Sequence, residues 1–302
     1  MCVIAAKYFE GTGWVGVKNR DRNYKPTIRI RQLMRRGVER LIIWDDVTKY
    51  TEGVNEYGVC ILNAATDVKK DEKIGINRPK NKKPKRGDPD FYAPDGLRIR
   101  NALLKKTPEA ALKELIKDEL RGSTIIFNED ECYLLEGMHE ERGREKWVYK
   151  VQKIKKDETI VRTNHGILIA WAGYPKDSDD EHFINSRKSS EERLKVSREE
   201  LLKITDPTKM MDAISSTKNS NPQMNPLRIE KRRGKRILRT TGQILLVPKE
   251  RTLHYRPIWG DVKFNDGINN NIKSKTNFEI ISSKKLLTFK EFKEYIHQGN
   301  SI

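Results

Sequence analysis

Residues Met1 to Phe9 read Met-Cys-Val-Ile-Ala-Ala-Lys-Tyr-Phe, an apolar and β-branched run that is typical of a buried strand. Gly11 and Gly13 favour a turn, after which Trp14 to Val17 can pair back on this strand and place Cys2 at its tip. Removal of the initiator methionine would leave an α-amine and a thiol on one residue, which is a nucleophile with its own base. The alternative interpretation is an inert core cysteine.

The length and charge of the chain set broad limits. A chain of 302 residues can bury a large core as a single unit. Lysine and arginine number 61 against 43 acidic residues, giving a net charge of +18. Such a charge predicts weak attraction to polyanions, nucleic acid or acidic partners, but it does not specify any chemistry.

The cysteines and the apolar segments indicate where the protein works. Cys2, Cys60 and Cys132 lack CxxC spacing, which argues against a disulfide framework or a zinc site and favours a reducing compartment. No stretch approaches the roughly 20 apolar residues of a membrane span, and no signal peptide is evident. We therefore expect a cytoplasmic protein with no membrane contact and no cofactor. Homo-oligomer formation is left open.

A polar cluster, Lys18 to Asn23, follows the predicted hairpin. Pairing with the first strand would bring the end of this second strand close to the thiol. Strand alternation places Asn19 and Asp21 on one face and Lys18 and Arg20 on the other, unless the chain bends at Asn19.

The next segments are predicted to be short strands. Val38 to Trp44 and Val47 to Thr51 have strand character, Glu52 to Gly58 is predicted to turn, and Val59 to Ala65 is an apolar strand. This last strand contains Asn63. A buried amide must be hydrogen-bonded or face a cavity, because leaving it unpaired costs about 1–3 kcal/mol.

Two stretches are strongly basic. Residues 67–96 combine lysine and arginine with proline and glycine and are predicted to be a surface loop inserted in the domain. A lid, a phosphate-binding arm and a plain solvated excursion all fit this composition. Residues 228–239 carry seven basic side chains.

Helices and strands alternate in blocks along the rest of the chain. Helices are predicted at Leu97 to Lys105, at Pro108 to Leu120 with Thr107 as N-cap, and at Ser189 to Ile204 with Glu192 completing a capping box. The other predicted strands are Ser123 to Phe127, Glu131 to Leu135, Lys146 to Ile154, Thr159 to Val161, Thr240 to Val247 and Arg251 to Ile258. The other predicted helices are Asp206 to Ile214 and, closing a C-terminal extension from 260 to 302, Leu287 to Ile296. This order predicts one layered α+β domain, residues 1–302, with two sheets sharing a core and helices outside.

Five motifs stand in a fixed order along the chain. They are Cys2, Asn19-Arg20-Asp21, Gly53 to Val59 leading into Ile61 to Asn63, Thr163-Asn164-His165-Gly166, and Ser189-Ser190 followed by Arg193. Together they resemble the N-terminal-nucleophile cysteine hydrolases, in particular the linear-amide group of choloylglycine hydrolase, penicillin V acylase and acyl-CoA:6-aminopenicillanate acyltransferase. The resemblance spans residues 2–193 and implies a four-layer αββα sandwich of two antiparallel sheets.

The resemblance also implies roles for individual residues. Cys2 would be the nucleophile, its freed α-amine the general base, and Asp21 the carboxylate that orients this amine. Asn164 and Asn63 would donate to the oxyanion of the tetrahedral intermediate. Arg193 would correspond to the helix arginine that steadies the family's site.

One position departs from the family pattern. Bile-salt hydrolases read Gly-Arg-Asn-x-Asp where this chain reads Val17-Lys18-Asn19-Arg20-Asp21. The cation expected beside the thiol is therefore Lys18, with Arg20 as a displaced candidate. A lysine is a point charge rather than a planar fork, so the geometry around the thiol is expected to differ.

The reaction implied by the resemblance is hydrolysis of a linear amide in a small-molecule substrate, through a thioester acyl-enzyme. Transfer of the acyl group to an amine instead of water would make the protein an acyltransferase. A different class of function, also compatible with the basic stretches, is a non-enzymatic nucleic-acid- or virion-associated protein on the same fold.

Overall fold

The computed structural model describes residues 2–66, 94–139, 147–174, 179, 181–229, 238–265 and 280–282. Most of the predicted basic loop at 67–96, most of the basic stretch at 228–239 and the predicted closing helix Leu287 to Ile296 lie outside the described residues.

The fold contains two sheets. The six-stranded sheet has the order β10-β1-β2-β11-β12-β14, and the eight-stranded sheet has the order β13-β3-β4-β5-β6-β7-β8-β9. The first sheet is built from β1 (Val3–Phe9), β2 (Gly13–Arg22), β10 (Ile160–Arg162), β11 (Arg239–Val247), β12 (Thr252–Pro257) and β14 (Ile280–Ser282). The second is built from β3 (Thr27–Arg35), β4 (Val38–Asp45), β5 (Thr51–Asn55), β6 (Cys60–Ala64), β7 (Gly122–Phe127), β8 (Cys132–His139), β9 (Trp147–Ile154) and β13 (Asp261–Asn265).

The sheets face each other across a shared apolar core. Ile4 and Trp14 of the six-stranded sheet pack against Leu62 and Phe127 of the eight-stranded sheet, and all four side chains are buried. A Cβ added at Gly16 would collide with the ring of Phe127, so the glycine lets the two sheets approach closely. Cys2 belongs to the same core cluster, which places its thiol between the sheets.

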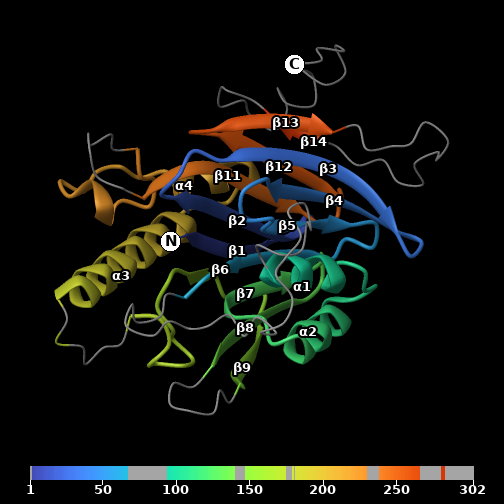
Figure 1. Ribbon diagram of the computed structural model, residues 1–302, viewed down its shortest axis with the longest axis horizontal. Coiled ribbons are helices and arrows are strands. Elements are labelled where there is room, and N and C mark those ends of the chain that lie inside the picture. The colour runs from blue at the N-terminus through green and yellow to red at the C-terminus, as the bar shows by residue number, and fades with distance from the viewer. Residues whose placement is uncertain are drawn as a thin grey trace, which may run out of the picture.

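Helices cover both outer faces. The helices α1 (Pro94–Ala102) and α2 (Pro108–Lys117) bury their apolar side chains on the eight-stranded sheet, and α3 (Glu181–Leu202) and α4 (Met210–Ala213) cover the six-stranded sheet. Figure 1 shows α3 on one side of the stacked strands and α1 and α2 on the other. The predicted four-layer αββα sandwich is confirmed. The two C-terminal strands are exceptions to its antiparallel pairing, because β13 pairs with β3 and β14 with β12 in parallel.

Local signals predicted several elements well. The hairpin of β1 and β2 pairs Val3 with Asn19 and Phe9 with Gly13. The hydroxyl of Thr107 accepts a hydrogen bond from the backbone N–H of Ala110 at 3.2 Å, which caps α2 as expected.

Strand β2 is longer than expected and runs through the polar cluster to Arg22. Its second half is held by β11, which pairs Asn19 with Gln243 and Asp21 with Thr240. The two faces alternate as predicted. Because β11 lies more than 200 residues away in the sequence, local patterning could not reveal this pairing.

Three other expectations were wrong. The segment Val47 to Thr51, predicted to be a strand, is mostly a turn, in which the side chain of Asp45 accepts hydrogen bonds from the backbone N–H groups of Val47 and Thr48. The strand β5 lies one step later and occupies much of the segment that was predicted to turn, Glu52 to Gly58. The third helix begins at Glu181 rather than at Ser189. Ser189 lies inside this helix, and its hydroxyl donates to the carbonyl of Gln223 at 2.6 Å. The hydroxyl therefore connects the helix to a distant segment and does not cap a helix end. The strand β3 was missed altogether.

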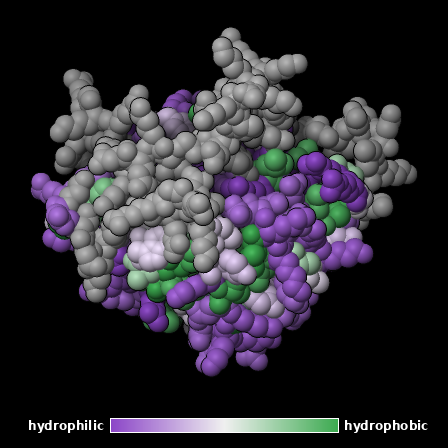
Figure 2. Space-filling model, turned by 60° about the horizontal axis from the view of Figure 1, so that its bottom comes forward, coloured by the Kyte–Doolittle hydropathy of each residue, from purple (hydrophilic) through white to green (hydrophobic). Residues whose placement is uncertain are grey.

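The surface agrees with the charged composition. On the face drawn in Figure 2, hydrophilic side chains dominate the described surface and hydrophobic ones form small separate groups. Among the described helices, none combines the length and the apolar content needed to cross a bilayer.

Candidate active site

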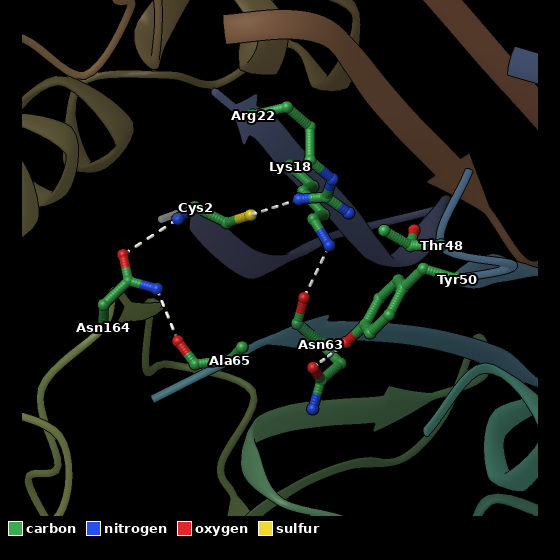
Figure 3. A pocket seen from close by; sticks show the side chains of 8 residues that line it. All are labelled: Cys2, Lys18, Arg22, Thr48, Tyr50, Asn63, Ala65 and Asn164. Carbon is green, nitrogen blue, oxygen red and sulfur yellow. Dashed lines mark hydrogen bonds between the residues drawn. The ribbon is translucent and has the colours of Figure 1, made fainter. Parts of the chain in front are cut away.

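A cavity of about 190 Å³ lies beside Cys2 (Figure 3). Its walls come from both sheets, from the turn before β5 and from the segment after β10. The lining residues are Cys2, Lys18, Arg22, Thr48, Tyr50, Asn63, Ala65 and Asn164. Four predicted site residues, Cys2, Lys18, Asn63 and Asn164, therefore meet at one cavity.

The backbone nitrogen of Cys2 is held by a side-chain amide. It donates a hydrogen bond to Oδ1 of Asn164 at 2.8 Å. Arg193 of α3 donates to the same Oδ1 at 3.3 Å and to the carbonyl oxygen of Cys2 at 3.4 Å. After removal of Met1 this nitrogen would be an α-amine in a fixed position next to its own thiol.

The thiol of Cys2 is ionised more readily than an ordinary buried cysteine. Burial raises its pKa, but the positive charges of Lys18, the chain's amino terminus and Arg22 outweigh burial and lower the pKa to about 7. Nη1 of Arg22 lies 3.9 Å from Sγ. Cys60 and Cys132 differ, because burial alone raises the pKa of each well above its usual value.

We expect the rate of Cys2 alkylation by iodoacetamide to rise with pH around a midpoint near 7, because the thiolate is the reacting form. Arg22→Gln removes one positive charge and should move this midpoint upward. Rates followed by intact mass between about pH 5 and 10 would test both statements. A wild-type midpoint at the free-cysteine value of about 8.5 would contradict the activated thiol.

A buried ionic cluster supports the thiol. Lys18 pairs with Glu52 and donates to the carbonyl of Asn63 at 2.6 Å. Arg20 lies behind the cavity wall, 3.1 Å from Asp45 and 3.4 Å from Glu52. Of the two cations predicted to stand beside the thiol, Lys18 lines the cavity and Arg20 does not.

Four lining residues, Arg22, Thr48, Tyr50 and Ala65, were missed at the sequence level, and two of them interact with the charged groups of the cavity. Arg22 lies on the same face of β2 as Lys18, so the period of two along the strand could have identified it. Tyr50 is the other. The centre of its ring lies 5.2 Å from Nζ of Lys18 and 5.6 Å from Cζ of Arg22, which are cation–π distances. Burial and the charge of Glu52 hold the pKa of Tyr50 well above its usual value, so its hydroxyl stays protonated.

Asp21 is linked to the nucleophile through an arginine. Its carboxylate accepts from the hydroxyl of Thr240 at 2.9 Å and pairs with Arg228 at 3.2 Å and with Arg193 at 3.8 Å. Arg193 in turn donates to the side chain of Asn164, which holds the Cys2 nitrogen. Asp21 therefore acts on this nitrogen through two side chains, Arg193 and Asn164. The resemblance implied that Asp21 orients the amine, and the contacts that connect the two run through Arg193 and Asn164.

Arg228 was assigned to a basic stretch by its sequence, yet it is fully buried. Besides Asp21, it binds the hydroxyl of Ser189 at 2.8 Å and the carbonyl of Gln223 at 2.7 Å. Nothing in its local sequence distinguishes it from the other basic residues of that stretch.

The two asparagines differ in what they can donate. The side-chain nitrogen of Asn63 donates to the carbonyl of Arg121 at 3.0 Å and to Thr124 at 2.7 Å, so both of its hydrogens serve the cavity wall. The side-chain nitrogen of Asn164 donates one hydrogen to the carbonyl of Ala65 at 2.5 Å. Among the described residues its second hydrogen has no acceptor, which leaves it able to donate to an oxyanion in the cavity that Asn164 lines.

A buried carboxylate shapes the segment that follows Asn164. Glu136 of β8 accepts from the backbone N–H groups of Ile167, Leu168 and Ile169, the shortest at 2.7 Å, and from Arg162 at 3.1 Å. This gathers the segment into a compact turn, anchored to the eight-stranded sheet.

His165 is placed away from the reacting groups. Its Nδ1 lies 2.8 Å from the hydroxyl of Ser190 and 3.2 Å from that of Thr163, and the residue does not line the cavity. Burial, reinforced by the nearby charge of Arg187, lowers the pKa of His165 to about 4, so the imidazole is neutral at pH 7.

The described residues contain no group of three or more histidine, cysteine, aspartate or glutamate side chains arranged to hold a metal ion. The groups beside the cavity that can take part in chemistry are the thiol, the adjacent nitrogen, the amide of Asn164 and the surrounding cations.

Comparisons with known proteins found similarity only at the level of solved structures. No family model and no curated protein sequence matches the chain. Penicillin V acylase from Agrobacterium tumefaciens is similar with 13% identity and a TM-score of 0.44, covering 85% of this chain and 83% of that chain. A mutant of conjugated bile acid hydrolase from Clostridium perfringens is similar with 10% identity and a TM-score of 0.44, covering 85% and 89%.

Proposed function

We propose that the protein hydrolyses linear amide bonds with Cys2 as an N-terminal nucleophile, after removal of Met1. The observation that carries this proposal is the pairing of an activated thiol with a held nitrogen on one residue. In the chain that still carries Met1, nearby positive charges lower the pKa of the thiol to about 7, and the Cys2 nitrogen is fixed by Asn164 at 2.8 Å, beside a cavity. This is the arrangement in which an α-amine can serve as base for its own side chain.

The first half of the reaction forms a thioester. The α-amine takes the thiol proton, and the thiolate attacks the carbonyl carbon of the amide. The oxygen of the tetrahedral intermediate accepts the second side-chain hydrogen of Asn164, while the positive charges of Lys18 and Arg22 stabilise the developing negative charge. The α-ammonium then gives its proton to the leaving amine, and the carbon–nitrogen bond breaks.

The second half releases the acid. The neutral α-amine takes a proton from water, the water oxygen attacks the thioester, and the carbon–sulfur bond breaks to return the thiol. Through both steps Arg193 fixes the carbonyl of Cys2 and the amide of Asn164, and it is itself paired with Asp21. These contacts keep the amine close to the thiol.

Two measurements test this proposal. Intact mass of the purified protein should show the loss of one methionine, because a retained Met1 would remove the base. Brief incubation with small p-nitroanilides of differing acyl chains, followed by acid quenching, should then show an acyl adduct on the N-terminal peptide. Added hydroxylamine would capture transferred acyl groups as hydroxamates and separate acyl transfer from hydrolysis. Retention of Met1 on active protein would contradict the mechanism.

A further inference from the structure

The charges around the cavity do not balance. Lys18, Arg20 and Arg22 project from one face of β2, and among the described residues they pair with two carboxylates, Asp45 and Glu52. All five side chains are buried or nearly so; Arg22 is the most exposed, at 15%. One positive charge is therefore left over. A buried charge is costly unless it is paired, so a negative partner is expected in the cavity.

The thiolate of Cys2 can supply this negative charge only in the resting enzyme. Once the sulfur is acylated it is neutral, and the excess positive charge has no partner among these residues. An anion carried by the acyl group would neutralise this positive charge until the thioester is hydrolysed. An anion on the leaving amine would depart with it.

Arg22 is the cation placed to bind such an anion. Its Nε lies 3.4 Å from Asp45, and its Nη1 donates to the carbonyl of Asp21 at 2.8 Å and lies 3.9 Å from Sγ of Cys2. Within the described residues its Nη2 forms no hydrogen bond. In Figure 3 the guanidinium lies between the sulfur and the side chains of Thr48 and Tyr50, at the edge of the cavity.

Asn164 lies on the other side of Cys2 from Arg22 in Figure 3. A carbonyl bound to Sγ can therefore direct its oxygen toward Asn164 while another substituent extends toward Arg22. The cavity has a volume of about 190 Å³, whereas one water molecule takes up ~30 Å³ in the liquid. A cavity of this size can therefore accommodate a short acyl chain of a few non-hydrogen atoms.

We infer that the cavity selects amides whose short acyl chain ends in a carboxylate, and that Nη2 of Arg22 is the specificity-determining donor to this carboxylate. This inference rests on the proposed amide hydrolysis for its substrate. The anion site itself can be tested without any hydrolysis. Hydrogen bonds to charged groups contribute about 1.5–3 kcal/mol, which corresponds to roughly a 10- to 100-fold preference.

The first experiment compares two alkylating reagents of nearly equal shape. Iodoacetate carries a carboxylate and iodoacetamide does not, and both react with the same thiolate, so the ratio of their rates at Cys2 cancels any change in thiol pKa. We expect Arg22→Gln to lower the iodoacetate-to-iodoacetamide ratio by at least about tenfold, and Arg22→Lys to retain part of the preference. Arg198→Gln, an exposed arginine of α3, is the matched control and should leave the ratio unchanged.

The second experiment compares three amides: glutaryl-p-nitroanilide, neutral pentanoyl-p-nitroanilide, and N-pentanoyl-4-aminobenzoate, whose carboxylate is on the amine. The wild-type kcat/KM should be highest for the glutaryl compound, and Arg22→Gln should remove its advantage over the neutral one. An unchanged alkylation ratio in Arg22→Gln, or a preference for the amine-side carboxylate, would overturn the inference. An Arg22-dependent ratio with no cleavage of any of the three amides would instead overturn the hydrolase proposal, and with it the substrate assignment, while leaving the anion site in place.

Discussion

Replacing Cys2 with alanine is expected to abolish amide turnover, with a loss of roughly 10⁵-fold or more, because the covalent route then has no nucleophile. The same variant should lose labelling of the N-terminal peptide by iodoacetamide. The side chain is small and buried, so the folded structure should persist with only a modest loss of stability. Steady-state rates and intact mass after labelling measure the two effects separately.

The matched controls are the other two cysteines. Cys60→Ala and Cys132→Ala remove thiols that are buried in the same core and have strongly raised pKa values. Both variants should retain activity at temperatures where they are folded. An equal loss of turnover in all three variants would show that the effect is structural and would contradict a nucleophilic role for Cys2.

Asn164→Ala should reduce turnover by roughly 10²- to 10³-fold with a much smaller change in KM, because its free hydrogen is needed when charge develops on the carbonyl oxygen. The alanine also removes the acceptor that holds the Cys2 nitrogen at 2.8 Å. Asn164→Asp keeps an acceptor but loses the donor. It also places a carboxylate against the carbonyl of Ala65 and against the forming oxyanion, so we expect at least as large a loss.

His165→Ala is the control for this second prediction. The imidazole is neutral, is bonded to Ser190 and Thr163 and lies outside the cavity wall, so turnover should fall only slightly while thermal stability decreases. The opposite ranking, with His165 essential and Asn164 dispensable, would indicate a cysteine–histidine pair and would exclude the α-amine as base.

Periodicity along single strands accounted for much of what the sequence could predict. The apolar run at the start of the chain predicted β1 and the hairpin. Alternation along β2 correctly separated Asn19 and Asp21 from Lys18 and Arg20. The same alternation extends to Arg22, which the prediction failed to include because it treated the cluster as the end of the strand.

Other features depend on contacts between distant segments, which a local pattern cannot contain. In the sequence, Arg228 is one basic residue of a basic stretch, and only the three-dimensional fold shows that it pairs with Asp21. Glu136 is an ordinary acidic residue of a strand until three backbone N–H groups and Arg162 meet its carboxylate. Ser189 has the signature of a cap, yet its hydroxyl serves Gln223 and Arg228.

The partners of Asp21 determine when the contacts around Cys2 can be completed. Arg228 and Thr240 lie 207 and 219 residues beyond it, and β11 must insert beside β2 before either contact can form. At about 5–20 residues per second, a ribosome makes these partners roughly 10–45 s after Asp21. Until these partners have been made, Asp21 cannot form the contacts that hold it beside Arg193. In the proposed mechanism, the contacts that fix the amine are therefore complete only after β11 has been made and has paired with β2.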